Sequence, residues 1–451
     1  MRRHSHYFAQ CLALTIFLGF QYESISTSLR MSTSQTRLKG FEGFSRSNPM
    51  SDTISALKFH HVEFYCGDAK TTYSRFLLGL GMELCAKSDQ STGNTVHASY
   101  AVQSGNMRML FTAPYNGAAS PDDFNDGGFP GFRAETATAF CRQHGLGVRA
   151  VAIEVADVTA SYASMLAGGG RGVLPPCTVN DAQSRGSIDL AEVALYGDVV
   201  LRLVHTSRFS GAFLPNFGDV QQPRPDGGFG LERFDHIVGN LHSLQPTVQL
   251  IKSMTGFHDF AEFVAEDVGT VDSGLNSVVL ANNNEMVLLP LNEPTFGTRR
   301  KSQIQTYLEQ NNGEGVQHMA LFSKDIFATM QRMRQQQFLG GFEFMPPPGG
   351  DYYPNMRRRL NGALSEQQLQ KVEELGLLAD RDDQGVLLQI FTRPVGDRPT
   401  LFLEIIQRIG CDIDVDGKTK KEQAPGCGGF GKGNFKDLFK SIEDFEKTLK
   451  I

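Results

Sequence analysis

Three side chains that commonly bind metals stand inside apolar, strand-like segments of the C-terminal half. They are His236 in FDHIV, His318 in VQHMA and Glu404 in FLEII. A polar or ionisable side chain in such a segment costs free energy unless it is paired or bound to a metal. Taken singly, each is better explained as a hydrogen-bonded core residue. The case for a metal therefore depends on comparison with the rest of the chain.

The first half contains a near copy of these segments. LGVRAVAIEVADV at residues 146–158 resembles EGVQHMALFSKDI at residues 314–326. The aligned positions are His61 with His236, Ala150 with His318, and Arg202 with Glu404. A methyl group and a guanidinium cannot complete a site for a divalent cation. The comparison therefore predicts a metal centre in the second half. It predicts that the first half keeps the same fold pattern without the ligand set.

Two imidazoles and one carboxylate form a facial triad, which covers one face of an octahedron and leaves three positions open. This arrangement suits ferrous iron that must bind an organic substrate and dioxygen together. One anionic ligand leaves the site with a net positive charge, which attracts an anionic, chelating substrate. Structural zinc favours a closed, cysteine-rich tetrahedron, and the seven scattered cysteines contain no Cys-x-x-Cys pair.

Composition limits the partners of this 451-residue chain, which is long enough for two or more domains. Lys and Arg number 43 against 49 Asp and Glu, with no long basic run, which argues against nucleic acid as the main partner. The odd number of cysteines predicts a reducing compartment without a disulfide framework. The apolar run CLALTIFLGF at residues 11–20 is too short for a membrane span, which takes about 20 apolar residues.

Residues 1–54 are predicted to form a disordered or targeting extension. Arg2 and Arg3 before the apolar run are typical of a targeting signal. Synthesis beginning at Met31 would instead make this run an upstream extension. The remainder up to Ile54 is rich in Ser, Thr and Arg and shows no strand or helix period. We expect a cytoplasmic protein, with a plastid or another organelle as the alternative.

The elements that must position these residues form two globular halves, residues 55–213 and residues 231–451. A Pro- and Gly-rich linker at residues 214–230 joins them. Each half opens on a similar strand, FHHV or FDHI, followed by a helix that ends at Gly and by several strand-like runs. This order, repeated twice in each half, predicts βαβββ modules and an α+β fold.

The chain closes on a predicted helix at residues 434–449, with one apolar stripe that packs onto the second half. The stripe consists of Phe435, Leu438, Phe439, Ile442 and Phe445. Just before it, GCGGFGKG has the Gly-x4-Gly-Lys spacing of a phosphate-binding loop. It lacks the Ser or Thr after Lys432 that would bind magnesium, and no apolar strand leads directly into it. Nucleotide binding is therefore not expected.

Several long motifs resemble the 4-hydroxyphenylpyruvate dioxygenase family of plants and algae. They are FDHIV, GVQHMAL, GVLLQIFTRP, RPTLFLEIIQR and GCGGFGKGNFKDLFKSIE, and the resemblance runs from about Phe59 to the C-terminus. It implies two vicinal-oxygen-chelate open-barrel domains. The first would lack metal, and the second would be catalytic and carry the C-terminal helix as a gate. It also implies a homodimer.

The resemblance further implies that His236, His318 and Glu404 hold Fe(II). The reaction would convert 4-hydroxyphenylpyruvate and dioxygen to homogentisate and carbon dioxide. It would belong to tyrosine and phenylalanine catabolism, and in photosynthetic hosts it would supply plastoquinone and tocopherol synthesis. The residues implied to be catalytic are Gln317, Gln389 and Phe391. Those implied to bind substrate are Ser277, Asn292, Gln303, Phe402, Phe430, Asn434 and Phe435.

Strand geometry supports some of these assignments and questions one. Gln389 and Phe391 lie two residues apart, so a strand places both on one face. Gln317 neighbours His318, and a regular strand would send the two side chains to opposite faces. Either the strand is distorted there or Gln317 acts through its neighbour. The glycines around Phe430 would let a lid hinge.

Three other functions stay open at this point. A 4-hydroxymandelate synthase would use the same iron, fold and substrate but would hydroxylate the benzylic carbon. A non-catalytic small-molecule-binding protein on this fold would need no complete triad, so the presence of His236, His318 and Glu404 argues against it. An extradiol dioxygenase would take a catechol in place of the keto acid.

Overall fold

The computed structural model describes residues 38–115, 129–220, 224, 227–268, 274–297, 299–410, 412–414 and 421–449. Leu38–Ile451 forms one compact unit. The targeting prediction for residues 1–37 lies outside the described residues. No helix in the described ranges is both long enough and apolar enough to cross a membrane.

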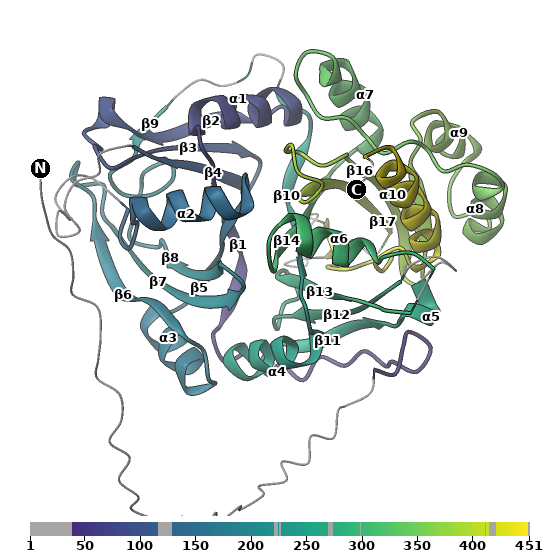
Figure 1. The fold of residues 1–451 in the computed structure, drawn as a ribbon, viewed down its shortest axis with the longest axis horizontal. Helices are drawn as coiled ribbons and strands as arrows, with labels where there is room; N and C mark the ends of the chain where they lie inside the picture. Colours follow the sequence, from purple (N-terminus) through teal and green to yellow (C-terminus); the bar gives the residue numbers. More distant parts are fainter. Residues whose placement is uncertain are drawn as a thin grey trace, which may run out of the picture. The chain divides into compact units, whose positions relative to one another are not determined.

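The first half of this unit is a nine-stranded sheet with three α-helices (Figure 1). Its strands are β1 (Ala56–Tyr65), β2 (Glu83–Ser88), β3 (His97–Ser104), β4 (Met107–Pro114), β5 (Gly147–Val155), β6 (Gly172–Asn180), β7 (Ser187–Tyr196), β8 (Val199–His205) and β9 (Gly218–Asp219). The helices are α1 (Ala69–Leu80), α2 (Ala134–His144) and α3 (Val158–Ala167), with a 3-10 turn η1 (Gln90–Thr92). The strand order is β6-β7-β8-β5-β1-β4-β3-β2-β9.

The second half repeats this plan in an eight-stranded sheet of order β11-β12-β13-β10-β14-β17-β16-β15. Its strands are β10 (Leu231–Asn240), β11 (His258–Phe263), β12 (Leu275–Ala281), β13 (Leu288–Pro294), β14 (Gly315–Ser323), β15 (Leu378–Arg381), β16 (Gly385–Phe391) and β17 (Phe402–Gly410). A separate ribbon pairs β18 (Asp412–Asp414) with β19 (Lys421–Gln423). The helices are α4 (Leu244–Thr255), α5 (Ala265–Val268), α6 (Gln303–Gln310), α7 (Ile326–Gln337), α8 (Tyr352–Leu360), α9 (Glu366–Glu374), the 3-10 turn η2 (Lys432–Asn434) and α10 (Phe435–Leu449).

The predicted βαβββ duplication is confirmed in both sheets. In each half the opening strands of the two modules pair antiparallel at the centre, β1 with β5 and β10 with β14. Each opening strand also pairs parallel with the last strand of its own module, for example β10 with β13 and β14 with β17. The modules therefore meet at the middle of each sheet.

The helix-ending glycines recognised in the sequence cap equivalent helices. Gly81 follows α1 with φ of 65°, and Gly256 follows α4 with φ of 72°. Both are left-handed C-cap positions, where a Cβ is unfavourable. Close packing adds to this, since a Cβ on Gly256 would lie 2.0 Å from the carbonyl oxygen of Ser51. A left-handed glycine cap therefore ends the first helix in each half, and the chain then continues into the next strand of the sheet.

The largest cluster of buried apolar residues runs through both halves. At its centre the rings of Phe59 on β1 and Phe234 on β10 pack edge to face, 6.1 Å apart. The C-terminal helix α10, predicted at residues 434–449, begins at Phe435 and buries Leu438 and Ile442. The side chain of Phe439, also expected on this stripe, lies outside the described side chains.

Residues 38–54, which the sequence assigned to the extension, lie along the second half. The Phe41 ring stacks on Phe263 at 5.7 Å. The backbone N–H of Asp52 donates to Asn283 at 3.0 Å, and that of Thr53 to the carbonyl of Thr255 at 2.9 Å. This segment forms no helix or strand of its own, and tertiary contacts hold it in place.

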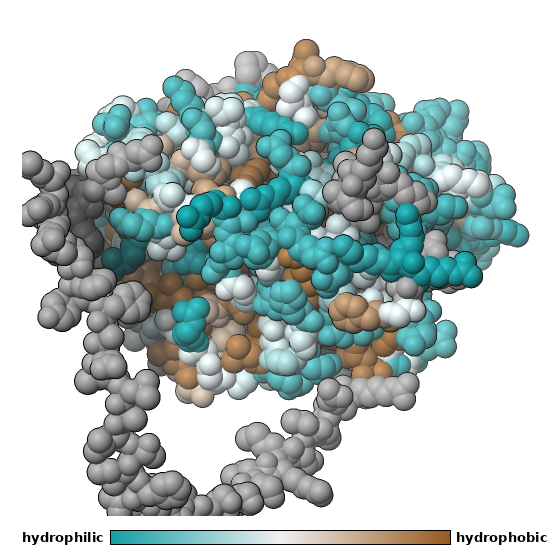
Figure 2. Space-filling model, viewed as in Figure 1, coloured by the Kyte–Doolittle hydropathy of each residue, from teal (hydrophilic) through white to brown (hydrophobic). Residues whose placement is uncertain are grey.

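The face seen in Figure 2 mixes hydrophilic and hydrophobic residues. Among the described residues the most exposed large apolar side chain is Phe338, which follows α7 and is 90% accessible. Four cysteines of the first half, Cys66, Cys85, Cys141 and Cys177, are free. Cys427 departs from the expectation of no disulfides, because it is disulfide-bonded; the odd count and the spacing of the cysteines did not signal this pair.

Candidate metal centre

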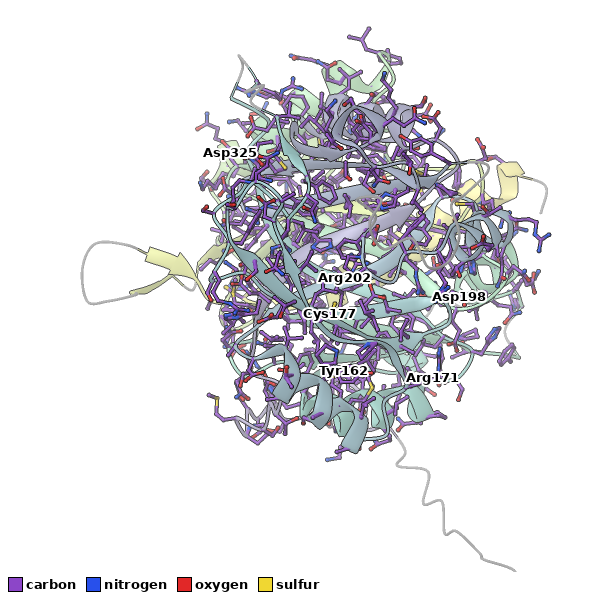
Figure 3. All side chains as sticks on the ribbon, turned by 90° about the vertical axis from the view of Figure 1, so that its left-hand side faces the viewer. Tyr162, Arg171, Cys177, Asp198, Arg202 and Asp325 are labelled. Atoms are coloured by element: carbon purple, nitrogen blue, oxygen red, sulfur yellow. The ribbon has the colours of Figure 1, made fainter. Side chains whose placement is uncertain are left out.

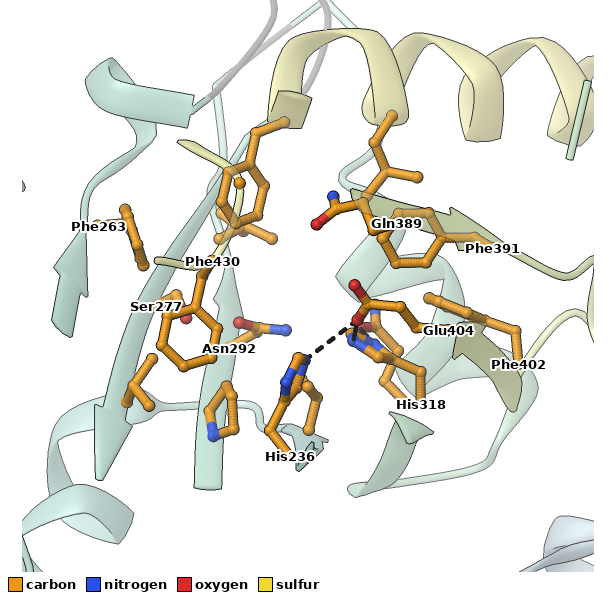
Figure 4. A pocket seen from close by; sticks show the side chains of 18 of the residues that line it. His236, Phe263, Ser277, Asn292, His318, Gln389, Phe391, Phe402, Glu404 and Phe430 are labelled. Carbon is orange, nitrogen blue, oxygen red and sulfur yellow. Dashed lines mark hydrogen bonds and ion pairs between the residues drawn. The ribbon is translucent and has the colours of Figure 1, made fainter. Parts of the chain in front are cut away.

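His236, His318 and Glu404 meet on three neighbouring strands, β10, β14 and β17 (Figure 4). Nε2 of His236 lies 3.1 Å and Nε2 of His318 lies 3.5 Å from Oε2 of Glu404. Their ligand atoms all lie within 4.8 Å of one another. Among the residues that the structure describes, this is the one such group able to hold a metal ion.

Strand register explains this convergence. The antiparallel pairing of β10 with β14 sets His236 opposite Ala320. The parallel pairing of β14 with β17 sets Ala320 opposite Glu404. His318 precedes Ala320 by two residues and therefore shares its face. The small side chain of Ala320 separates the two outer ligands in this row.

Two β-bulges place a polar neighbour beside each histidine. The β10–β14 register shifts between Phe234 and His236, and again where Val238 pairs with His318 and Gly239 with Val316. A bulge adds one residue to a strand and so brings adjacent side chains toward the same face. The first bulge contains Asp235 and the second contains Gln317. This resolves the difficulty raised for Gln317, because the strand is distorted at that residue.

These neighbours fix the tautomers of the two imidazoles. Nδ1–H of His236 donates to Oδ1 of Asp235, and Nδ1–H of His318 donates to Oε1 of Gln317, each at 2.9 Å. Both acceptors are oxygens, so the proton must be on Nδ1. Each Nε2 is then the nitrogen that faces Glu404, and it would bind a metal once it has lost its proton. Metal-bound histidines in proteins generally have such a partner on the other nitrogen.

The charges of the trio suit a bound cation. Burial raises the pKa of Glu404, but the charge and hydrogen bond of His236 and the hydrogen bond of His318 outweigh it and hold this pKa at about 2. Burial likewise raises the pKa of Asp235, and Arg408 outweighs it, so that pKa lies well below its ordinary value. Both carboxylates are therefore anionic in the neutral pH range.

The first half has the same register with different chemistry. Ala152 on β5 pairs with His61 and with Arg202, as Ala320 pairs with His236 and Glu404. Figure 3 turns the first half toward the viewer and labels Arg202. Its guanidinium donates to Nε2 of His61 at 2.9 Å. It also forms ion pairs with Glu63 at 2.6 Å and with Glu192 at 2.7 Å. A buried guanidinium thus takes the place that a cation would have in the second half.

One cavity collects almost all the residues assigned to the site. Besides the trio they are Ser277, Asn292, Gln303, Gln317, Gln389, Phe391, Phe402, Phe430 and Phe435. Figure 4 shows Phe391 and Phe402 on the side of His318, and Phe430 on the side of His236. The Phe402 ring stacks on the His318 imidazole at 4.8 Å, and the Phe430 ring meets His236 edge to face at 5.2 Å. Phe402 and Phe430 therefore pack directly against the two histidines of the trio.

Asn434 is the exception, because it does not line this cavity. Its side chain is fully buried, and Oδ1 accepts hydrogen bonds from Tyr352 at 2.7 Å and Arg359 at 3.2 Å. In this structure Asn434 therefore ties the start of α10 to α8 instead of facing a substrate. The sequence alone could not separate these two roles for a polar residue beside Phe435.

Sequence reasoning also missed part of the site. The apolar lining residues that it did not assign to the site are Val238, Phe263, Leu275, Val279, Pro290, Leu387, Leu438 and Ile442. These lie in ordinary apolar strand and helix patterns and carry no distinguishing signal. Arg408 was missed too, although a signal existed. It lies four residues after Glu404 in the apolar strand FLEIIQRIG, where a charged residue would be buried.

Known proteins were compared with the chain. No family profile matches it. The chain is 56% identical over 427 residues to 4-hydroxyphenylpyruvate dioxygenase of Daucus carota, covering 94% of this chain and 95% of that protein. It is 52% identical over 421 residues to the enzyme of that name from Arabidopsis thaliana, covering 92% and 93%.

A solved structure shares the fold. It is a mutant of 4-hydroxymandelate synthase from Streptomyces coelicolor, with a TM-score of 0.65 and 21% sequence identity, covering 87% of this chain and 99% of that one. At this identity the likeness supports the predicted fold class, with two similar open-barrel halves.

Proposed function

The chain belongs to the 4-hydroxyphenylpyruvate dioxygenase family, and we propose that it converts 4-hydroxyphenylpyruvate and dioxygen to homogentisate and carbon dioxide. The enzyme is a dioxygenase of tyrosine catabolism. We place its chemistry in the second half, residues 231–451, and regard residues 55–213 as a metal-free domain. The segment at residues 214–230 links the two.

The distribution of charge in the cavity carries this proposal. The described lining residues include Glu404 and no Lys or Arg. An anionic keto acid entering such a cavity would meet no Lys or Arg side chain, so we expect its negative charge to be balanced by a bound cation. The trio of His236, His318 and Glu404 is the group that could hold one.

We propose Fe(II) as that cation. The donor set fits, because two imidazoles and one carboxylate leave open positions for substrate and dioxygen, and the described residues that line the cavity include no cysteine. Bound ferrous iron would supply chelation of the α-keto acid and activation of dioxygen. The protein has its own tasks, which are to fix the ligands, position the ring and exclude water.

The side chains around the trio can perform these tasks. Phe391, Phe402 and Phe430 offer apolar walls against which an aromatic ring packs. Gln303, Gln389 and Asn292 carry amide N–H groups that can donate to the oxygens of the substrate. Phe430 and Phe435 belong to the loop and helix that cover the cavity, so their movement would admit substrate and then exclude water. Asn434 would act by anchoring this cover.

The decisive experiment identifies the product. Protein purified without oxygen and loaded with Fe(II) should consume dioxygen only when 4-hydroxyphenylpyruvate is present, and chromatography should detect homogentisate. Metal-free protein treated in the same way is the control and should consume none. Hydroxymandelate as the product would instead assign the synthase reaction.

Two further outcomes would contradict the proposal. Binding of the keto acid without oxygen uptake would indicate a binding protein. Uptake with catechol in place of the keto acid would indicate an extradiol dioxygenase. The sequence identity of 56% to a plant 4-hydroxyphenylpyruvate dioxygenase over 94% of the chain supports the keto acid.

Assembly and location are part of the same proposal. On the family resemblance we propose a homodimer, which light scattering of the purified protein tests directly. We propose cytoplasmic location, with import into a plastid or another organelle through residues 1–54 as the alternative. Fusion of that segment to a fluorescent protein distinguishes the two.

A further inference from the structure

Arg408 is a buried arginine of β17 that no step of the proposed reaction uses. Its side chain is 0% accessible to solvent. It lies on the same strand as Glu404 but points to a different set of partners. These partners belong to two parts of the site that are far apart in the sequence.

The first partner is Asp235, which orients the metal ligand His236. Nε of Arg408 donates to Oδ2 of Asp235 at 3.0 Å, and Nη2 donates to Oδ1 at 2.7 Å. This is a bidentate pair, which fixes the plane of the carboxylate as well as its charge. The same Oδ1 accepts the Nδ1–H of His236 at 2.9 Å. The orientation of this imidazole is therefore set through Arg408.

The second partner is the glycine-rich loop at residues 426–431, which we call the lid loop. Nη1 of Arg408 donates to the carbonyl oxygens of Cys427 at 2.5 Å and Gly429 at 2.7 Å. The next residue, Phe430, packs on His236 and has its ring centre 5.6 Å from the guanidinium. One side chain thus holds both the carboxylate beside the metal ligand and the backbone that carries a cavity wall.

We propose that Arg408 is a positioning residue that couples closure of the lid loop to the orientation of His236. This inference rests on the proposed function only in taking the trio as a metal site. When the loop is closed, its two carbonyls fix Nη1, and the planar guanidinium then holds Asp235 in position. Loosening of the loop would release the carboxylate, and with it the imidazole.

Arg233 supplies a matched control. It also carries a positive charge near Asp235, with Nη1 at 3.4 Å from Oδ2. Its guanidinium packs over the ring of Phe322 at 4.6 Å, and its hydrogen bonds go to the carbonyl of Phe234 and to Asp235. Substituting Arg233 therefore removes a neighbouring charge without removing the lid-loop hydrogen bonds of Arg408.

The test compares Arg408→Met, Arg408→Lys and Arg233→Met in the full chain. Metal affinity is measured by anaerobic titration with Co(II), whose absorption reports the ligand geometry. Loop opening is measured by hydrogen exchange of peptides spanning the lid loop. Because Cys427 is disulfide-bonded, a covalent link also restrains this loop, so the variants are compared as reduced protein.

Arg408→Met is expected to raise exchange in the lid loop and to weaken metal affinity by about 10- to 100-fold, the usual effect of removing an outer partner of a metal ligand. Arg408→Lys keeps the charge but cannot reach all four acceptors, so it should restore folding and still loosen the loop. Arg233→Met should leave loop exchange unchanged. Neither measurement requires turnover, so the result stands apart from the proposed reaction.

Two outcomes overturn the coupling. Faster loop exchange with unchanged Co(II) affinity and spectrum would make Arg408 a loop anchor only. Weaker Co(II) binding with unchanged loop exchange would make it a partner of Asp235 only. If Arg408→Met does not fold, the same two comparisons are made on Arg408→Lys.

Discussion

At the residue scale, the two halves differ in the source of positive charge at their equivalent positions. The second half gathers two imidazole nitrogens and one carboxylate around a place for a cation. The first half puts the cation on the chain itself, as Arg202 between Glu63 and Glu192. Removing one partner of a buried ion pair leaves an uncompensated charge. The first-half cluster should therefore be destabilised by the loss of any one partner, and it is unsuited to metal binding.

This contrast predicts different results for two histidine variants. His318→Ala removes one of three ligands and should abolish retention of Fe(II) after desalting, measured as iron per chain. His61→Ala should retain the wild-type iron content, because His61 contacts Arg202 and not the trio. Its effect should appear as a lower temperature of unfolding. Equal iron loss in both variants would show that the metal site has been assigned to the wrong residues.

At the element scale, bulges and a glycine loop decide how the site is assembled. The β10 bulge at Asp235 has a counterpart in β1 at His60, where Nδ1 of His60 lies 2.7 Å from Nδ1 of His61. In both halves the bulge therefore places the residue before the histidine against the imidazole. That residue is His60 in the first half and Asp235 in the second. The lid loop is specific to the second half, and four of its glycines have positive φ, from 66° to 78°.

Two adjacent glycines allow a matched test of how closely the lid loop must pack. Gly428 and Gly429 have φ of 78° and 70°, so alanine should strain the backbone similarly at both, by about 1–2 kcal/mol. A Cβ on Gly428 would lie 2.9 Å from backbone atoms of Val386 and Leu387, whereas one on Gly429 would meet only Asp382, at 3.6 Å. Gly428→Ala should therefore displace the loop from β16.

The expected result is a larger rise in KM for Gly428→Ala than for Gly429→Ala, since the Phe430 wall moves with the loop. Steady-state oxygen uptake at varied keto acid concentration measures it. Similar KM values in the two variants would mean that the contact with β16 does not control the cavity.

At the scale of the whole molecule, one core joins the halves, so the first half can limit stability although it contributes no residue to the trio. Its interior holds imidazoles that burial keeps neutral. Burial lowers the pKa of His97 to about 4, from an ordinary value of 6.5. His97 is 1% exposed, and its ring accepts the N–H of Phe129 at 3.1 Å.

This burial gives a pH dependence with a definite sign. Between pH 6.5 and about 4, His97 binds a proton in the unfolded chain but not in the native one, so stability must fall as the pH falls. The slope from one such histidine is at most about 1.4 kcal/mol per pH unit. His97→Gln removes this contribution and should flatten the dependence of the unfolding temperature on pH in that window. Parallel curves for the two proteins would contradict the assignment.

The ligand trio and the duplicated modules were accessible from sequence for a local reason. Residue type, period-two alternation and glycine caps are properties of short segments. Comparison of two copies within one chain then isolated His318 against Ala150 and Glu404 against Arg202. The strand pairs that align these residues follow from the same repeat, and the structure has them in register.

The remaining features depend on contacts between distant segments. Bulges arise from the pairing of two strands, so the placement of Gln317 beside His318 could not be read from one of them. Asn434 faces Tyr352 because α10 begins against α8. Arg408 joins β10 to the lid loop through hydrogen bonds that span up to 173 residues of sequence. The sequence by itself determined which chemical groups are present and in which half they lie. The tertiary structure decided which of them form hydrogen bonds or ion pairs and which line the cavity together, because these contacts join segments that are far apart in the chain.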